Sequence, residues 1–237
     1  MLYLIRHGQT DWNKNKLIQG HADIPLNEAG KQQAKRVAER FRDIHIDVIY
    51  TSDLLRAQET AREIAAAAKV EKIEVCEQLR ERSFGELESK NVEVLHELVP
   101  NYATNWGEEP LYNIETLEAA QERMVRRLTE IMKKSIGKKV AVVSHGAAIN
   151  TFIHHVTSGE QGTGTTILQN TSITTFAYES GKWRLETIND AKHLSRRTSQ
   201  ISLNGSSSAR PLLTRGRCRR RPTMSSASST GCRRRAP

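Results

Sequence analysis

The chain has 237 residues, of which 37% are hydrophobic and 27% charged, and this length can bury the core of one large or two small domains. It contains no long apolar run and no charged lead-in followed by an apolar stretch, so we expect neither a membrane span nor a secretory signal. The three cysteines form neither a disulfide framework nor a metal-binding spacing, which predicts a reducing, cytoplasmic location.

The net charge of +9 is concentrated near the C-terminus. From Ala191 onward there are 12 lysine and arginine residues and no acidic residue, so the first 190 residues carry a net charge of −3. Residues 195–237 are rich in Ser, Arg, Gly and Pro without an apolar period, which predicts a disordered tail. We interpret this tail as an appendage to a folded domain over residues 1–194. The alternative is a basic arm that contacts nucleic acid through charge alone.

The first 190 residues alternate between short apolar runs and segments of helical period. In chain order, the pattern predicts a strand over 2–6, a helix over 28–42, a strand over 46–52, a helix over 54–68, a strand over 72–79, a helix over 116–135, a strand over 139–146 and a helix from about Ala147. Two further strands, "SITTFAYE" and "KWRLETI", flank Ser180-Gly181 and predict an antiparallel hairpin.

This alternation predicts an α/β fold, a three-layer α/β/α sandwich with a mostly parallel sheet and an antiparallel edge strand. Residues 83–115 do not follow the alternation and contain several glycines and prolines. We interpret them as a small helical insertion that lies over the functional site.

Two predicted strands end in the same way. The first runs into Arg6-His7-Gly8, and the strand over 139–146 ends in His145-Gly146. Ligands of open α/β sheets bind beyond the carboxyl ends of the strands. Arg56 lies one turn into the helix that follows another strand, so two imidazoles and two guanidinium groups can converge on one small volume.

This set of side chains suits an oxyanion such as a phosphoryl group. Arginine's forked donors match its oxygens, and helix N-termini and glycine amides, here Gly8 and Gly146, add anion affinity. A neutral imidazole can attack phosphorus and form a covalent intermediate, and a second imidazole, if charged, can stabilise the oxygens. His7 and His145 lack a nearby acidic cluster, and the chain has no HExxH or CxxC, so we expect no metal and no cofactor.

An alkoxide leaving group also requires a proton donor. The segment after the strand over 72–79 offers Glu77, Glu81 and Glu86, and spacing alone does not choose among them.

Five segments resemble, in order and spacing, the histidine phosphatase superfamily, the phosphoglycerate mutase-like family. They are "LIRHGQTDWN", "GHADIPLNEAGKQQA", "TSDLLRAQETA", "LRERSFGE" and "VVSHGAAI". The resemblance covers roughly residues 1–190 and is to the compact bacterial-type branch of broad-specificity phosphatases.

The resemblance assigns roles to matching positions. It implies that His7 becomes phosphohistidine, that Glu81 is the proton donor, and that Arg6, Arg56 and His145 line the phosphate pocket. It also matches three substrate-binding positions: Asn13, Gln19 and Gly20. Turn chemistry explains Asn13 and Gly20 equally well.

The interval between Glu81 and His145 bears on the activity. It holds 63 residues, whereas the true mutases that the chain resembles usually carry longer insertions there. The resemblance therefore implies a phosphatase acting on small phosphorylated metabolites, with phosphoglycerate mutase activity as the nearest alternative. A second alternative is an inactive relative that binds a phosphorylated metabolite, although the complete set of matching residues argues against it. One departure is Leu87-Glu88-Ser89, where the family often has Trp-Glu-Gly.

Overall fold

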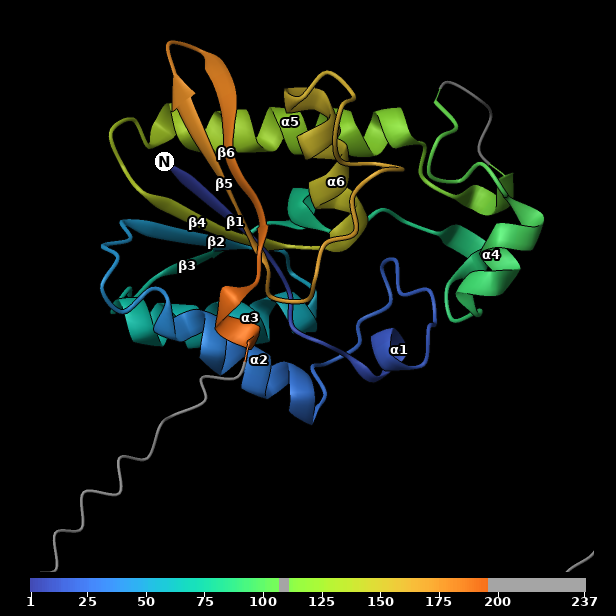
Figure 1. The fold of residues 1–237 in the computed structure, drawn as a ribbon, viewed down its shortest axis with the longest axis horizontal. Coiled ribbons are helices and arrows are strands. Elements are labelled where there is room, and N and C mark those ends of the chain that lie inside the picture. Colours follow the sequence, from blue (N-terminus) through green and yellow to red (C-terminus); the bar gives the residue numbers. More distant parts are fainter. Residues whose placement is uncertain (107–110, 196–237) are drawn as a thin grey trace, which may run out of the picture. The chain divides into compact units, whose positions relative to one another are not determined.

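The computed structural model describes residues 1–106 and 111–195, and the rest of the predicted tail lies outside the described residues. Six strands form one mixed sheet in the order β3-β2-β4-β1-β5-β6 (Figure 1). The strands are β1 (Leu2–Arg6), β2 (Val48–Thr51), β3 (Ile73–Val75), β4 (Val140–Ser144), β5 (Ile173–Glu179) and β6 (Lys182–Asp190). The first four are parallel, and the β5–β6 hairpin joins them antiparallel to β1.

Helices cover both faces of this sheet. They are α1 (Asp11–Lys14), α2 (Glu28–Glu39), α3 (Leu55–Ala68), α4 (Val92–Leu98), α5 (Leu117–Lys134) and α6 (Gly146–Val156). In Figure 1, α2 and α3 lie on one side of the sheet and α5 and α6 on the other, while α4 stands away from it. The predicted three-layer sandwich is therefore confirmed. None of the helices in the described part of the chain has the length and apolar composition to cross a membrane.

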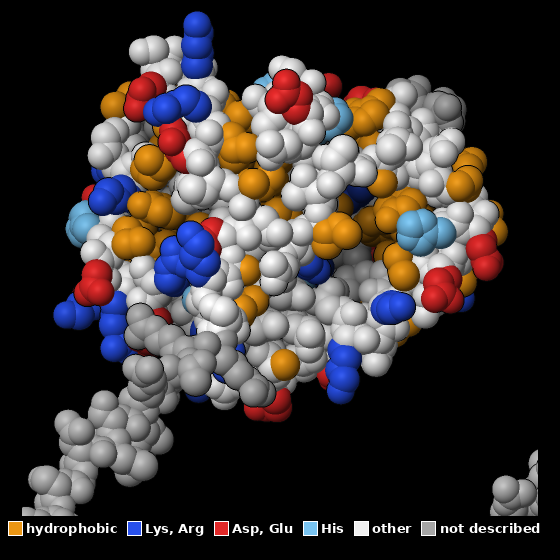
Figure 2. Space-filling model, in the orientation of Figure 1, with side chains coloured by type: hydrophobic (Ala, Val, Ile, Leu, Met, Phe, Trp, Pro, Cys, Tyr) orange, Lys and Arg blue, Asp and Glu red, His pale blue; other side chains and the backbone are white. Residues whose placement is uncertain are grey.

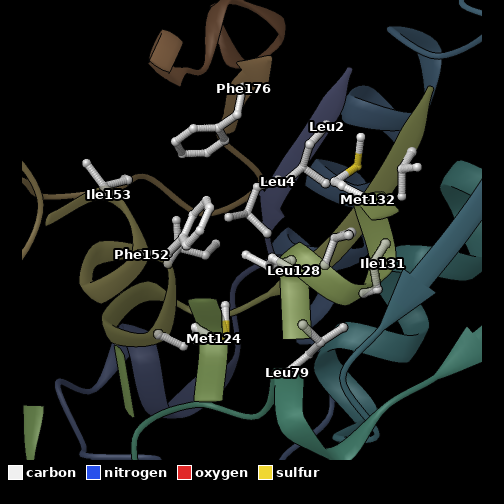
Figure 3. Packing of buried hydrophobic residues seen from close by; sticks show 14 of the residues in the cluster. Leu2, Leu4, Leu79, Met124, Leu128, Ile131, Met132, Phe152, Ile153 and Phe176 are labelled. Carbon is white, nitrogen blue, oxygen red and sulfur yellow. The ribbon is translucent and has the colours of Figure 1, made fainter. Parts of the chain in front are cut away.

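The central strands are apolar on both sides because helices cover both faces of the sheet. Every residue of β4 is buried. Along β1, Leu2 and Leu4 pack toward α5 and α6, whereas Ile5 packs toward α2 and α3. Figure 3 shows the first of these layers, in which side chains from α5 and α6 meet those of β1. This packing fixes where β1 and β4 end, and so where His7 and His145 lie.

The strand predicted over 72–79 is shorter in the structure. β3 ends at Val75, and residues 77–79 form a 3₁₀ turn. This strand lies at the edge of the sheet with β2 as its neighbour. The turn buries Leu79, whose carbonyl accepts a hydrogen bond from Ser144 Oγ at 2.8 Å. The chain thereby returns toward the carboxyl end of β4, which brings Glu81 to the site.

The predicted insertion over 83–115 contains α4 and two short 3₁₀ turns, at 85–87 and 111–113. It has a small apolar core of its own, which includes Phe84, Leu95 and Ile114 and extends to Ile18. Because Ile18 follows α1, the insertion packs against the segment that comes after the first histidine motif, Arg6-His7-Gly8.

Phe152 on α6 is a direct test of the packing in Figure 3. Its ring lies 4.9 Å from that of Phe176 and 5.0 Å from that of Trp183, measured between centroids. We expect Phe152→Ala to lower the free energy of unfolding by about 3–5 kcal/mol, measured by urea denaturation, because it leaves a cavity in a fully buried layer. The control Ile136→Ala, at a position 83% exposed, should change it by less than about 0.5 kcal/mol. A loss for Phe152→Ala as small as that of the control would contradict this packing.

Candidate active site

A cavity of about 670 Å³ opens where β1 ends and the insertion begins. Figure 2 shows the surface hollowed near α4, with hydrophobic side chains gathered around the hollow. Seven of the ten predicted site residues line the cavity: Arg6, His7, Asn13, Gln19, Gly20, Arg56 and Glu81. Gly8, His145 and Gly146 belong to the adjoining strand ends and to the start of α6. The sequence prediction therefore identified one spatial cluster.

His7 is buried at the end of β1, with 2% of its surface exposed. Its Nδ1 lies 2.7 Å from the carbonyl oxygen of Gly8. Because a carbonyl can only accept, Nδ1 carries the proton, and the neutral ring has its free lone pair on Nε2. Burial, and then the charges of Arg56 and Arg6, hold the pKa of His7 well below 6.5. Nε2 of His7 is therefore an unprotonated nitrogen beside two cations.

His145 faces His7, with ring centroids 5.0 Å apart. Arg56 Nε donates to His145 Nδ1 at 3.2 Å. Since a guanidinium can only donate, this contact places the proton of the neutral ring on Nε2, which is buried and has no hydrogen-bond partner among the described residues. Burial, followed by the charge of Arg56, holds the pKa of His145 well below 6.5. The second imidazole is thus a neutral donor, where the sequence analysis allowed a charged one.

Arg56 is fully buried in the first turns of α3. Besides His145, its guanidinium donates to the carbonyl oxygens of Gly20 at 2.8 Å and Ala22 at 2.7 Å. Burial lowers its pKa to about 10, so it keeps its charge at neutral pH. One side chain therefore supplies positive charge, fixes a histidine and holds the loop over residues 20–22.

One nitrogen of the Arg6 guanidinium group is held by the backbone, and another has no partner among the described residues. Nη1 donates to the carbonyl of Leu168 at 2.5 Å, while Nε is buried without a partner among the described residues. Burial lowers its pKa, and the opposing charge of Glu81 raises it. A Cβ on Gly146 would lie 3.4 Å from Arg6 Nε, an ordinary van der Waals contact, so the start of α6 packs directly beside the guanidinium.

Gly8 is explained by packing. A Cβ at this position would lie 2.7 Å from the carbonyl oxygen of Gly30, so only glycine allows α2 to approach the strand end this closely. Its amide donates to Thr60 Oγ1 at 3.0 Å. The contact ties the histidine motif to α3.

Glu81 is held at the N-terminus of α6. Its carboxylate accepts from the backbone amides of Ala148 at 2.8 Å, Ala147 at 3.1 Å and Arg82 at 2.9 Å. Glu77 instead forms an ion pair with Arg80, and Glu86 accepts from Asn113; neither lines the cavity. The structure thus separates three carboxylates that spacing alone left equivalent.

Arg123 on α5 is a site-supporting residue that the sequence analysis did not identify. It donates to the carbonyl oxygens of Gln78, Arg80 and Glu81 at 2.8–3.0 Å and forms an ion pair with Glu115 at 2.6 Å. It therefore holds the backbone on which Glu81 stands. The available signal was a basic residue beside the apolar face of the predicted helix, which by itself indicates only a solvated side chain.

His21 and Glu88 form a second support. His21 Nε2 lies 2.9 Å from the Glu81 carbonyl, and Glu88 Oε1 accepts from the amides of His21 at 2.9 Å and Phe84 at 3.2 Å. Ser89 adopts a left-handed φ of 70° where the resembling family often has glycine. The departure noted in the sequence therefore keeps the acidic residue, and Ser89 holds a conformation that glycine favours.

Asn13 takes part in the turn chemistry expected from the sequence, and both Asn13 and Gln19 lie in the cavity wall. Asn13 completes a capping box with Thr10 at the start of α1 and also lines the cavity. Thr10 Oγ1 donates to Gln19 Oε1 at 2.9 Å, which holds Gln19 in the wall. The side chains that cap α1 therefore also shape the wall of the cavity.

The wall opposite the histidines comes from the insertion and from the loop after α6. Tyr102 lines the cavity, and Trp106 stacks on His154 with a centroid separation of 4.5 Å. No group of three or more histidine, cysteine or acidic side chains within residues 1–106 and 111–195 is arranged to hold a metal ion.

Comparison with known proteins agrees with this geometry. The family model described as histidine phosphatase superfamily (branch 1) matches residues 2–191. The chain is 35% identical over 193 residues to the uncharacterized phosphatase PhoE of Bacillus subtilis, covering 81% of this chain and 95% of that protein. It is 33% identical over 205 residues to the probable phosphoglycerate mutase GpmB of Escherichia fergusonii, covering 81% and 94%.

The fold is also that of solved relatives. A mutant of phosphoserine phosphatase from Entamoeba histolytica, in complex with phosphoserine, matches with a TM-score of 0.74 and 32% identity, covering 81% of this chain and 98% of that one. The predicted fold and the predicted phosphatase class are confirmed by these similarities. The paired histidine motifs, the matching family model and the solved relative lead to one conclusion: the chain belongs to the histidine phosphatase superfamily, branch 1.

Proposed function

We propose that this protein hydrolyses small phosphate monoesters in two steps through a phosphohistidine on His7. The observation that carries the proposal is the 2.7 Å contact between His7 Nδ1 and the carbonyl oxygen of Gly8. The Gly8 carbonyl binds Nδ1–H, so the lone pair of Nε2 is free in a buried, cation-lined site. The domain that does this spans residues 1–194, with the insertion over 83–115 as one wall of the cavity.

In the first step, His7 Nε2 attacks phosphorus and the bond from phosphorus to the leaving oxygen breaks. Arg6 Nε and His145 Nε2–H are buried donors without a hydrogen-bond partner among the described residues, and we assign both to the phosphoryl oxygens. Glu81, on the cavity wall, supplies the proton that the leaving oxygen needs. The products of this step are an alcohol, phosphohistidine and the Glu81 carboxylate.

In the second step, water attacks the phosphorus of phosphohistidine. The Glu81 carboxylate takes a proton from that water, the phosphorus–nitrogen bond breaks, and inorganic phosphate leaves with His7 neutral again. The amides of Ala147 and Ala148 keep the carboxylate at the start of α6 between the two steps. Charge is handled by arginines, so we expect no metal requirement, and the cysteine content favours a cytoplasmic location.

Phosphoglycerate mutase activity is the second candidate, because relatives of similar identity bear that name. A mutase would return the phosphoryl group from His7 to a bound product instead of to water. The two activities separate when the enzyme is given 3-phosphoglycerate, because release of inorganic phosphate supports the phosphatase and interconversion without release supports the mutase. An inactive relative would do neither.

Replacement of the nucleophile should abolish the reaction. We expect His7→Ala to lower kcat/KM for p-nitrophenyl phosphate by at least about 10³-fold and to eliminate acid-labile phosphate labelling of the protein. His45→Ala, at an exposed surface position, is the matched control and should retain both. Labelling that persists in His7→Ala would show that another residue is the nucleophile.

Replacement of the proton donor should depend on the leaving group. We expect Glu81→Gln to slow hydrolysis of alkyl phosphates by about 10²- to 10⁴-fold and that of p-nitrophenyl phosphate by less than tenfold, because an aryl oxide leaves without protonation. Glu86→Gln controls for loss of a nearby carboxylate that accepts from Asn113 outside the cavity. Equal losses on both ester classes would contradict the role of Glu81.

The pKa of His7 can be measured directly. Because burial and two arginine charges lower it, the neutral ring is lost only when the pH falls through this lowered value. In phosphate-free buffer, the NMR resonances of the His7 ring, assigned by their absence in His7→Ala, should stay constant from about pH 8 to about pH 6 and titrate below that range. A midpoint at or above 6.5 would contradict the electrostatic account of this site.

A further inference from the structure

The turn over residues 169–172, which precedes β5, reaches the nucleophile from the far end of the domain sequence. We propose that Asn170 is a positioning residue: its side-chain amide fixes the backbone of His7 and sets the orientation of the Asn13 amide. The inference rests on the proposed function, because it concerns the placement of the proposed nucleophile and of a group that faces the phosphoryl oxygens.

Asn170 makes two contacts with the first histidine motif. Its Nδ2 donates to the carbonyl oxygen of His7 at 3.1 Å and to Asn13 Oδ1 at 3.3 Å. An amide nitrogen carries two hydrogens, so one Asn170 side chain can serve both acceptors. The partners are 163 and 157 residues away in sequence, so these contacts are tertiary and are not a local turn cap.

The contact with Asn13 decides which end of that amide meets a ligand. Asn13 Oδ1 also accepts from the backbone amide of Thr10 at 3.1 Å, so two donors hold the oxygen. Asn13 Nδ2 is then the end that remains for a ligand, and Asn13 lines the cavity. An amide nitrogen in this position can donate to a phosphoryl oxygen, whereas a reversed amide would present an oxygen and repel it.

The contact with His7 acts on the backbone that carries the nucleophile. The His7 carbonyl receives a second hydrogen bond, from the Thr171 amide at 3.2 Å, and the same amide donates to the Arg6 carbonyl at 2.9 Å. Arg6 in turn donates through its own amide to the Ser172 carbonyl at 3.2 Å. The end of β1 is thus held by one turn on both Arg6 and His7.

Hydrogen bonds hold this turn in an unusual conformation. Thr171 is fully buried with a φ of 60°, a conformation that β-branched residues rarely adopt. Its hydroxyl donates to the Asn170 carbonyl at 2.7 Å and lies 3.0 Å from His193 Nε2. Burial lowers the pKa of His193 to about 4, so the ring is neutral and its Nε2–H can donate to this hydroxyl. The unusual conformation is therefore held from both sides.

The first experiment measures the rate at which His7 is phosphorylated. We expect Asn170→Ala and Asn170→Asp each to lower the single-turnover rate at saturating p-nitrophenyl phosphate by about 10- to 100-fold, because the nucleophile loses its fixed position. Asn170→Asp keeps the shape of the side chain but removes both donated hydrogen bonds. The control Gln169→Ala changes the neighbouring exposed side chain and should leave the rate within about twofold of the unchanged protein.

The second experiment is a double-mutant cycle with Asn13→Ala. If Asn170 acts partly through Asn13, the effect of Asn170→Ala on kcat/KM should shrink at least about threefold when Asn13 is already absent. A general loss of packing would instead give additive effects. Should Asn170→Ala fail to fold, shown by loss of the cooperative thermal transition, the cycle is run with Asn170→Ser.

The outcomes separate this inference from the proposed function. If the unchanged protein forms no acid-labile phosphate label, the proposed function fails. If it forms the label and the Asn170 variants form it at the same rate, or if the cycle is additive, only the positioning role of Asn170 is overturned.

Discussion

The site depends on burying positive charge at the end of β1 and β4. Arg6 and Arg56 lie beside two imidazoles, and Glu81 is the carboxylate that opposes their charge. Burial of cations is costly unless carbonyl groups or anions replace water. Here the carbonyls of Gly20 and Leu168 do so in part, and Arg6 Nε remains without a described partner. An oxyanion can accept hydrogen bonds from the remaining donors, so binding of a phosphoryl group offsets the cost of burying these cations.

Different hydrogen-bond partners give the two histidines opposite tautomers. His7 and His145 each follow an apolar strand and precede glycine, yet the first meets a carbonyl acceptor and the second a guanidinium donor. The proton therefore lies on Nδ1 in His7 and on Nε2 in His145. One ring presents a lone pair and the other a donor, across a centroid distance of 5.0 Å. Burial, followed by the charge of Arg56, keeps both rings neutral, and the contact with Arg56 sets the direction in which His145 donates.

Apolar runs and their polar ends were sufficient to predict the sheet, its helices and the convergence of His7 with His145, because strand ends carry their side chains to a common edge. The choice of Glu81 over its neighbours required the family resemblance, since it depends on a 3₁₀ turn that replaces the end of a predicted strand and on the amides of α6. The contacts that Arg123 and Asn170 make could not be predicted from local pattern. Each acts on backbone or amide groups more than 40 residues away, and no period or motif encodes such a contact.

The proposed nucleophile and the opposite wall of the cavity lie on different parts of the chain. His7, His145 and Arg56 lie at strand ends and helix starts, which are fixed by the packed layers of the sandwich. The opposite wall comes from the insertion, including Phe84 and Tyr102, with a small core of its own. Substitutions in that wall can change which leaving group fits without moving His7. They can also change whether a bound product can reorient and take back the phosphoryl group before water attacks. Relatives of 33–35% identity carry phosphatase and mutase names, so the shared fold does not by itself decide between the two activities.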